Sequence, residues 1–322
     1  MIDAMRWSLV GVLVAACYAP TPPAGAPCGA GGVCPTGLTC TSDVCTRDTS
    51  PADASHPLDG ELRNDGPQPG SDAPPADAAP GDQDGDGVPD AIDNCPTVSN
   101  ASQHDEDHDQ LGDACDPCPV NVNNVDSDHD GVGDACDPNP DTAGDAILLF
   151  EGFGAPLPSW TSQGTWSVTG DQAVVTTAAN EVAWLSPPVA SGAAHSTLFA
   201  EITIDAFVGT GNRGVGVAAP YATPDSGLEC EVGLVAGNNS VRFAGLIDIA
   251  AASIKNGGTF AGSTGLFDLA YTRSGTSYTC VASAGGTNGT ATTTFTDAAT
   301  GMALRTRSVN AHYAWVMWVT SP

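Results

Sequence analysis

The chain has 322 residues, among them 38 acidic and 9 basic side chains, and its formal net charge at pH 7 is −29. This negative charge argues against nucleic acid as a partner, because a phosphate backbone would be repelled, and the length favours two or more domains. From residue 145 onward there are 12 acidic and 6 basic residues, which leaves 26 and 3 before it. The acidity therefore belongs to the first part of the chain.

The first residues are typical of an export signal. Arg6 precedes a short apolar run that ends in Val14-Ala15-Ala16-Cys17 and is too short to span a bilayer. The small residues before Cys17 resemble the lipobox of bacterial lipoproteins. This resemblance implies a signal peptide over 1–16, lipidation of Cys17, and a lipid-anchored protein at the bacterial outer membrane or cell surface. An ordinary signal peptide with an unmodified cysteine is the alternative. Without Cys17, ten cysteines remain, an even number that suits disulfide pairing after export.

Three short segments come next. A Pro-rich spacer over 17–27 leads to four closely spaced cysteines, Cys28, Cys34, Cys40 and Cys45. So short a stretch cannot bury a core, so we expect a small disulfide-rich knot over 28–45, with its connectivity open. Zinc is the competing ligand, but the usual C-x2-C spacing is missing. Residues 46–81 are rich in Pro, Ala, Asp and Gly, which predicts a disordered, extended stalk.

Residues 82–140 contain three aspartate-rich loops with one common spacing. The aspartates occupy positions 1, 3, 5, 9 and 12 of each loop: Asp82, Asp84, Asp86, Asp90 and Asp93, then Asp105, Asp107, Asp109, Asp113 and Asp116, then Asp126, Asp128, Asp130, Asp134 and Asp137. Without a cation these carboxylates would repel one another. An acidic disordered linker is the alternative interpretation, but random acidity does not keep a period.

Calcium is the cation that fits this pattern, because it takes six to eight oxygen ligands. We expect carboxylates from positions 1, 3, 5 and 12, a water-linked group at position 9, and the position-7 carbonyls of Val88, Leu111 and Val132 to hold about three or more ions. Glycine at position 6 permits the sharp turn. The second loop has Gln110 there, so we expect it to be the weaker or more distorted site.

These loops differ from EF-hands, since no helical period flanks them and position 12 is Asp. The segments DQDGDGVPDAIDNCPTVSNASQHDEDHDQLGDACD and CPVNVNNVDSDHDGVGDACD resemble thrombospondin type 3 repeats, which are calcium-filled arrays with almost no core. The resemblance implies the disulfides Cys95–Cys115 and Cys118–Cys136, although four cysteines alone allow three connectivities. His104, His108 and His129 lie beside or within the loops, and we expect them to be solvated, with zinc binding as the alternative.

From 145 to 322 the sequence reads as many short strands, and alternation from Leu198 to Val208 gives the period of two expected of a half-buried strand. This predicts a mainly β, multidomain chain with a C-terminal antiparallel β-sandwich of the jelly-roll type. Its layout and the Trp160–Trp166 region resemble concanavalin A-like or laminin G-like jelly rolls. We expect Cys230 and Cys280 to pair as a staple between strands.

The last strand is apolar on both faces, so it should be an inner strand whose neighbour is Ile147–Phe150. Strict alternation puts on one face Tyr313, Trp315, Met317 and Val319, and on the other Ala314, Val316 and Trp318.

No catalytic motif is found, so the sequence predicts a binding protein. Two pairs of carboxylates share strand faces, Glu201 with Asp205 and Glu229 with Glu231, and we interpret them as solvent-facing residues. Exposed aromatic rings that can stack on sugars are Trp160, Trp184 and Tyr221. We expect a calcium-binding cell-surface lipoprotein that presents the sandwich for adhesion or for carbohydrate or protein binding. An extracellular polysaccharide hydrolase and a purely structural envelope spacer are the alternatives.

Overall fold

The computed structural model describes residues 38–41, 44–47, 81–223, 225–237, 241–261 and 264–322. The chain divides into two compact units, Met1–Ala73 and Pro74–Pro322. The expected signal peptide, lipidated Cys17, spacer, Cys28, Cys34 and residues 48–80 of the stalk lie outside the described residues. No helix among the described residues is long and apolar enough to cross a membrane.

The described part of the first unit is a hairpin of β1 (Leu38–Thr41) and β2 (Val44–Arg47). Its register places Cys40 directly opposite Cys45. The backbone therefore brings together two of the four cysteines expected to form the knot.

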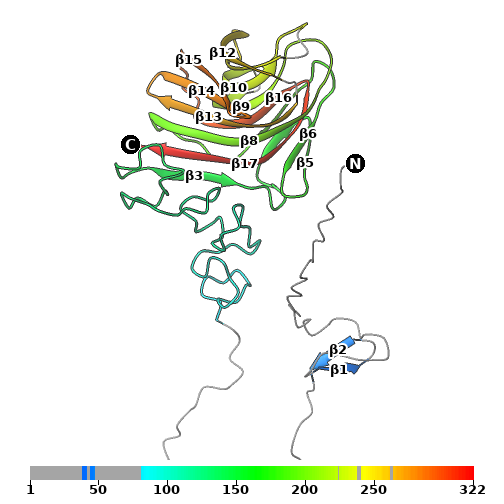
Figure 1. Ribbon diagram of the computed structural model, residues 1–322, viewed down its shortest axis with the longest axis vertical. Helices are drawn as coiled ribbons and strands as arrows, with labels where there is room; N and C mark the ends of the chain where they lie inside the picture. Colours follow the sequence, from blue (N-terminus) through cyan, green and yellow to red (C-terminus); the bar gives the residue numbers. More distant parts are fainter. Residues whose placement is uncertain (1–37, 42–43, 48–80, 224, 238–240, 262–263) are drawn as a thin grey trace, which may run out of the picture. The chain divides into compact units, whose positions relative to one another are not determined.

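The second unit contains an antiparallel β-sandwich, which confirms the predicted fold class (Figure 1). The seven-stranded sheet has the order β12 (Ser253–Ala261), β11 (Val241–Asp248), β10 (Ser226–Leu234), β9 (Arg213–Thr223), β16 (Gly301–Arg307), β7 (Val182–Ser186) and β4 (Thr161–Gln163). The eight-stranded sheet has the order β15 (Thr287–Thr294), β14 (Ser277–Ala284), β13 (Gly265–Ser274), β8 (His195–Phe207), β17 (Val309–Ser321), β6 (Ala173–Thr176) and β5 (Thr165–Val168), and β3 (Ala146–Glu151) also pairs with β17.

The core lies between the two sheets and follows the alternation in the sequence. On β8 the buried residues are Leu198, Ala200, Ile202 and Ile204, which confirms the period of two. Cys230 on β10 is bonded to Cys280 on β14. The staple therefore joins one sheet to the other through the core.

Strand β17 is an inner strand beside both β8 and β3, as predicted. The predicted faces are wrong at one point, because a register shift between Tyr313 and Trp315 interrupts the alternation. Tyr313 consequently joins Val316 and Trp318 in the main core. Trp315, Met317 and Val319 face the other side of the sheet.

The aspartate-rich repeats cover that other side. Val132 and the disulfide Cys118–Cys136 pack against Met317 and Val319 of β17, with β3 residues beside them. In Figure 1 the repeat segment lies directly under β3 and β17. This contact explains why β17 is apolar on both faces, since one face packs on the sandwich core and the other on the repeats.

Candidate calcium sites and the surfaces around them

The three loops fold in the same way from their first aspartate. Its two carboxylate oxygens accept the backbone N–H groups of positions 4 and 6, as in Gly85 N to Asp82 Oδ1 at 2.8 Å and Gly87 N to Asp82 Oδ2 at 3.1 Å. The corresponding bonds of Asp105 and Asp126 are 2.8 to 3.0 Å long. Short acidic side chains that bond to nearby backbone favour such turns. The shared spacing therefore produces a shared backbone.

Position 6 requires a left-handed backbone in every loop. The φ angles are 96° at both Gly87 and Gly131, and 83° at Gln110. Glycine adopts such angles without a steric cost, whereas a glutamine does not. Gln110 thus keeps the loop geometry and carries backbone strain at position 6 that the glycines of the other two loops avoid.

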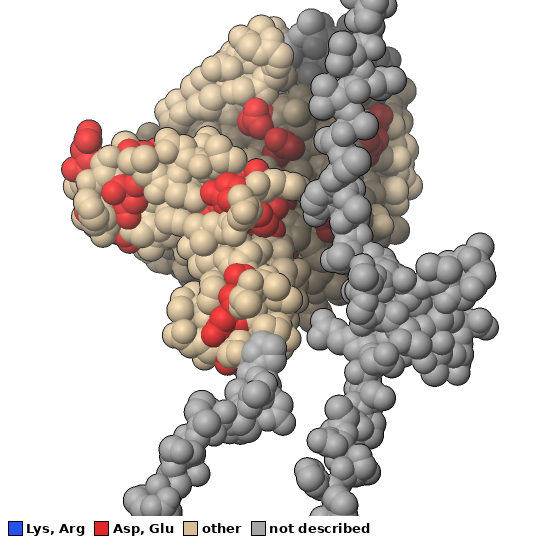
Figure 2. Space-filling view, turned by 60° about the horizontal axis from the view of Figure 1, so that its bottom comes forward, with Lys and Arg blue, Asp and Glu red and all other residues tan. Residues whose placement is uncertain are grey.

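The carboxylates of positions 1, 3 and 5 converge in each loop. Ligand oxygens lie within 4.8 Å of one another in three such groups, Asp82 with Asp84 and Asp86, Asp105 with Asp107 and Asp109, and Asp126 with Asp128 and Asp130. Figure 2 shows the acidic side chains gathered in separate patches, with no lysine or arginine colour visible on this face of the described residues. The structure thus brings together the predicted ligands of positions 1, 3 and 5.

Buried oxygens without a partner mark these groups as cation sites. They belong to position 3 and position 12 of the loops, namely Asp84 Oδ2, Asp93 Oδ2, Asp107 Oδ2, both oxygens of Asp128, and Asp137 Oδ2. A buried carboxylate oxygen with no donor is costly unless a cation binds it. The donor set is oxygen only, which suits calcium. The residues present therefore fit the predicted ion.

The pKa values follow from the same crowding. Burial, then the charges of Asp107, Asp109 and Asp113, raises the pKa of Asp116 to about 6, against the opposing hydrogen bond from Cys118 N. Burial and a hydrogen bond shared with Asp145 raise the pKa of Asp137 to about 7. A bound cation would favour the ionised carboxylates.

Positions 7, 9 and 12 are placed by backbone bonds. The N–H groups of Val88, Leu111 and Val132 donate to the position-5 carboxylates at 2.8 to 2.9 Å, which fixes the peptides at position 7. The position-9 carboxylates instead reach back across the loop and accept backbone N–H groups of position 2 from Gln83, Glu106 and Ser127. Each position-12 carboxylate accepts the N–H two residues later, from Cys95, Cys118 and Asn139.

Asp145 is a candidate ligand that the sequence reasoning missed. It is almost fully buried, and its carboxylate groups with those of Asp130 and Asp137 within 4.8 Å. The N–H groups of Gly144 and Asp145 donate to Asp130 Oδ2 at 2.9 and 2.6 Å. The other two position-5 aspartates also accept hydrogen bonds from residues 14 or 15 positions ahead, Asn100 and Asn124, but this relation is visible only in the structure.

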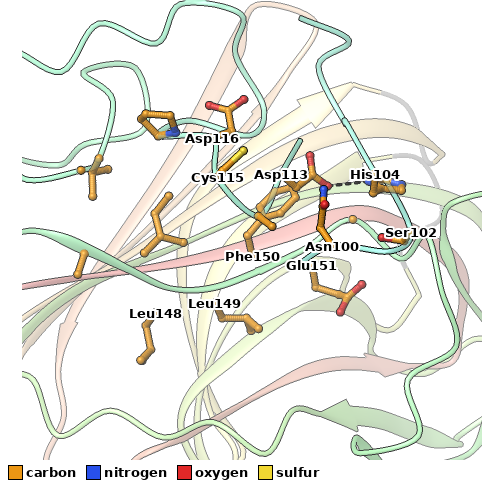
Figure 3. Close-up of a pocket in the computed structure, with 18 of the residues that line it drawn as sticks. Asn100, Ser102, His104, Asp113, Cys115, Asp116, Leu148, Leu149, Phe150 and Glu151 are labelled. Carbon is orange, nitrogen blue, oxygen red and sulfur yellow. Dashed lines mark hydrogen bonds and ion pairs between the residues drawn. The ribbon is translucent and has the colours of Figure 1, made fainter. Parts of the chain in front are cut away.

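A cavity of about 620 Å³ lies between the second loop and β3 (Figure 3). His104 Nδ1 lies 2.6 Å from Asp113 Oδ2, and a Cβ atom at Gly154 would collide with the His104 ring. The expectation that His104 is solvated is therefore wrong. Burial lowers the pKa of His104, but the hydrogen bond and charge of Asp113 outweigh it and raise the pKa overall. Burial raises the pKa of nearby Glu106 to about 7.

The carboxylates of β10 are not solvent-facing, which corrects that interpretation. Glu229 and Glu231 are 0% and 2% exposed, Glu229 is paired with Arg305, and Glu231 Oε2 lies 3.7 Å from Arg307 Nη2. Burial, then the charge of Glu229, raises the pKa of Glu231 to about 8, against the opposing arginines.

The other proposed pair, Glu201 and Asp205 on β8, does not form a joint site, because each carboxylate has a different neighbour. Asp205 Oδ2 is 3.2 Å from His312 Nδ1, whereas Glu201 lies opposite Asp268 of β13. Neither pair of carboxylates is arranged around an open cleft in the described part of the chain.

The three candidate sugar-binding aromatics differ in exposure. Tyr221 is only 5% exposed, so the expectation that its ring is open to solvent is wrong. Its ring centroid lies 6.2 Å from that of Trp184, which is half-buried and donates Nε1 to Gln163 Oε1 at 3.3 Å. Trp160 is half-buried beside Phe153. The structure does not bring Trp160 together with the other two.

This geometry defines a segment of aspartate loops docked on a β-sandwich. Residues 77–103 and 125–148 match the thrombospondin type 3 repeat family. These segments are therefore thrombospondin type 3 repeats, which are calcium-binding elements. They contain the first and third Asp groups described above, whereas Asp105, Asp107 and Asp109 lie between the two matched segments.

No curated protein matches the chain. Among solved structures, the CBM2 module of an evolved Dit of Lactobacillus casei BL23 phage J-1 aligns at a TM-score of 0.43 and 10% identity, over 55% of this chain and 96% of that one. Bacteroides ovatus xyloglucan PUL GH43B aligns at 0.42 and 14%, over 56% and 41%. The VIP36 exoplasmic/lumenal domain, in a form bound to Ca²⁺ and Man3GlcNAc, aligns at 0.38 and 10%, over 51% and 84%.

Proposed function

We propose that the protein is an exported, calcium-loaded surface protein whose repeats hold a carbohydrate-binding β-sandwich in a fixed position. One observation supports this most. The third loop offers the carboxylates of Asp126, Asp128 and Asp130 to a cation, and the same loop inserts Val132 into the apolar contact with β17. Ion binding and attachment to the sandwich therefore depend on the same twelve residues.

Calcium acts in this proposal as the element that makes the loop rigid. Without an ion, three converging carboxylates repel one another and favour an open loop. With an ion they are neutralised, and the loop keeps the backbone that presents Val132 to Met317 and Val319. Attachment of the third repeat then depends on calcium, whereas the sandwich core, which lies on the other side of β17, does not.

Export and the lipid anchor are supported by residues 1–17 and by the disulfides. The three described disulfides, Cys95–Cys115, Cys118–Cys136 and Cys230–Cys280, all suit an oxidising compartment. A mature N-terminus at a diacylated Cys17, detected by mass spectrometry of the membrane fraction, tests the anchor. An unmodified terminus downstream of Cys17 would contradict it.

Carbohydrate binding is favoured over hydrolysis for the sandwich. The two glutamates of β10 are closed off from solvent and form ion pairs with arginines, so a substrate has no access to them. Half-buried tryptophans remain accessible at the edges of the sandwich, and such rings stack on sugars. Sugar release from polysaccharide by the full chain, abolished in Glu229→Gln, would favour the hydrolase instead.

Calorimetric calcium titration of the full chain tests the calcium-dependent attachment. We expect Asp128→Asn to remove one ion from the stoichiometry and to make residues 115–140 sensitive to protease, while the sandwich melts at an unchanged temperature. Asp141→Asn is the matched control, since Asp141 is an exposed carboxylate outside the ligand groups. Equal stoichiometry and equal protease resistance in the two variants would refute the proposal.

A further inference from the structure

A hollow of about 240 Å³ opens at one end of the sandwich, where the edges of the two sheets meet. It is lined by Pro156, Leu157, Trp160, Ser162, Trp166, Ser167, Val168 and Leu185. Strand β4 is the edge of the seven-stranded sheet and β5 the edge of the eight-stranded sheet. Only Gly164 separates these strands, with a φ of 91° that favours glycine. The chain thus crosses from one sheet to the other in a single residue, beside the hollow.

Two tryptophans are held rigidly at this hollow. The Trp160 ring meets the buried ring of Phe153 edge-on, with centroids 6.2 Å apart. The Trp166 ring lies 6.0 Å from that of Tyr313, and its Nε1 donates to Gln163 O at 3.0 Å. Each ring is therefore anchored on its inner side and half-buried rather than enclosed. Rings held in this way bind a ligand without losing further side-chain freedom.

Two polar groups at the hollow have no hydrogen-bond partner among the described residues. They are the Trp160 indole N–H and the hydroxyl of Ser162, which is exposed and lies opposite Leu185 of β7 on the inner face of β4. Ser167 alternates with Trp166 and Val168, which pack on the core, so its hydroxyl lies on the outer face of β5. The rest of the lining is apolar and includes no ionisable side chain, although 15% of the whole chain is charged. The hollow is thus an uncharged site with aromatic faces and a few free hydrogen-bonding groups.

This chemistry matches one class of ligand. A neutral pyranose has a face of C–H groups that stacks on an indole ring and hydroxyls at its edge that bond to serine and indole N–H groups. A uronic acid or sulfated sugar would find no lysine or arginine here to balance its charge. The volume lies below the roughly 300 to 1,000 Å³ of pockets that enclose a drug-sized ligand. The space therefore suits one ring, with the remaining glycan outside.

We propose that the hollow formed by Trp160, Trp166 and Ser162 is a binding site for one neutral pyranose residue of a glycan chain. The inference rests on the proposed carbohydrate-binding function and assigns it a place. Trp160 and Trp166 supply the stacking faces, and the Ser162 hydroxyl and the Trp160 indole N–H supply the hydrogen bonds. Trp184 and Tyr221 lie outside this lining and do not take part.

Affinity electrophoresis and tryptophan fluorescence of the calcium-loaded full chain test the site. The probes are three neutral polysaccharides, laminarin, xyloglucan and galactomannan, and one anionic polysaccharide, polygalacturonate. We expect the wild type to bind at least one neutral probe with a change in emission. Trp160→Ala and Ser162→Arg should each weaken that binding at least tenfold. Ser162→Arg fills the exposed rim without removing a packed side chain, so it keeps the test valid if Trp160→Ala is unstable.

Thr165→Arg is the matched control, because it adds the same charge at an exposed residue of β5 that does not line the hollow. Binding by the wild type that Ser162→Arg leaves intact would overturn this site and leave the carbohydrate-binding function standing. Binding of polygalacturonate alone would overturn the assignment to a neutral sugar. No binding of any probe would refute both the site and the function.

Discussion

Glu231 allows a quantitative test of the buried charges in the sandwich. Its side chain is almost fully buried on β10, with Glu229 on the same strand and Arg305 and Arg307 on β16. Burial and the charge of Glu229 raise the pKa of Glu231 to about 8, from an ordinary value of 4.5. We predict that Glu231→Gln stabilises the protein at neutral pH, because glutamine resembles the protonated form that the fold prefers.

The sign and size of this stabilisation follow from the linkage between proton binding and folding. Below pH 4.5 the folded and unfolded chains both hold the proton, and Glu231 then carries no penalty. Between pH 4.5 and about 8 only the folded chain keeps it, so rising pH favours unfolding. Each pH unit costs about 1.4 kcal/mol, which amounts to about 3 kcal/mol at pH 7. The advantage of the variant should therefore grow from about 1 kcal/mol at pH 5 to about 3 kcal/mol at pH 7 and level off above pH 8.

Urea unfolding of both proteins in saturating calcium, measured at several values between pH 5 and 8.5, provides the free energies. The pH dependence of the calcium sites is common to both proteins and cancels in the difference. Asp141→Asn, which removes an exposed negative charge, is the control and should show no such trend. A difference between wild type and Glu231→Gln that stays constant with pH would refute the reasoning.

Three further predictions concern the repeats and the staple. Replacing Cys230 and Cys280 by alanine opens a loop of 50 residues, and the loop-closure relation gives a loss of about 4 kcal/mol in denaturant unfolding; an unchanged midpoint would contradict this. Gln110→Gly relieves the left-handed backbone and should tighten calcium binding at the second loop by about 1 kcal/mol, or roughly fivefold, in calorimetry; unchanged or weaker binding would count against strain there. Val132→Ala should weaken the packing of the third repeat on β17 by about 2 kcal/mol, which hydrogen exchange over 115–140 in saturating calcium would report as faster exchange. Val122→Ala changes a residue that is 64% exposed and should leave the exchange rate unchanged.

The repeats are the part of the molecule that the sequence predicts best. Their geometry is local, since Asp82, Asp105 and Asp126 each bond to backbone groups three and five residues ahead. A fixed spacing therefore determines both the turn and the convergence of the ligands. Asp145 was missed because it reaches Asp130 from the start of the next element, where the aspartate spacing no longer applies.

The sequence predicts the strands of the sandwich, but it predicts less well which residues of each strand face the core. Alternation along β8 gives the buried side correctly, because that face is uninterrupted from Leu198 to Ile204. One irregularity between Tyr313 and Trp315 exchanges the faces of β17, and no local signal marks it. The acidic residues of β10 mislead for a different reason, since the arginines that bury them come from β16, more than 70 residues away. Charge in a sequence predicts exposure only when its partners are also known.

Strand β17 shows how the aspartate-rich repeats and the sandwich depend on each other. Its inner face completes the sandwich core through Val316 and Trp318, while Met317 and Val319 alternate with them and would be open to water without the repeats. An exposed apolar stripe on a broad sheet favours aggregation. The sandwich therefore needs the third repeat as a cover, and the repeat, which has almost no core of its own, needs the sandwich as a support. Calcium that stabilises the loop around Val132 then also keeps this face of the sandwich covered, so the ion protects the folded sandwich from association through β17 without contributing to its core.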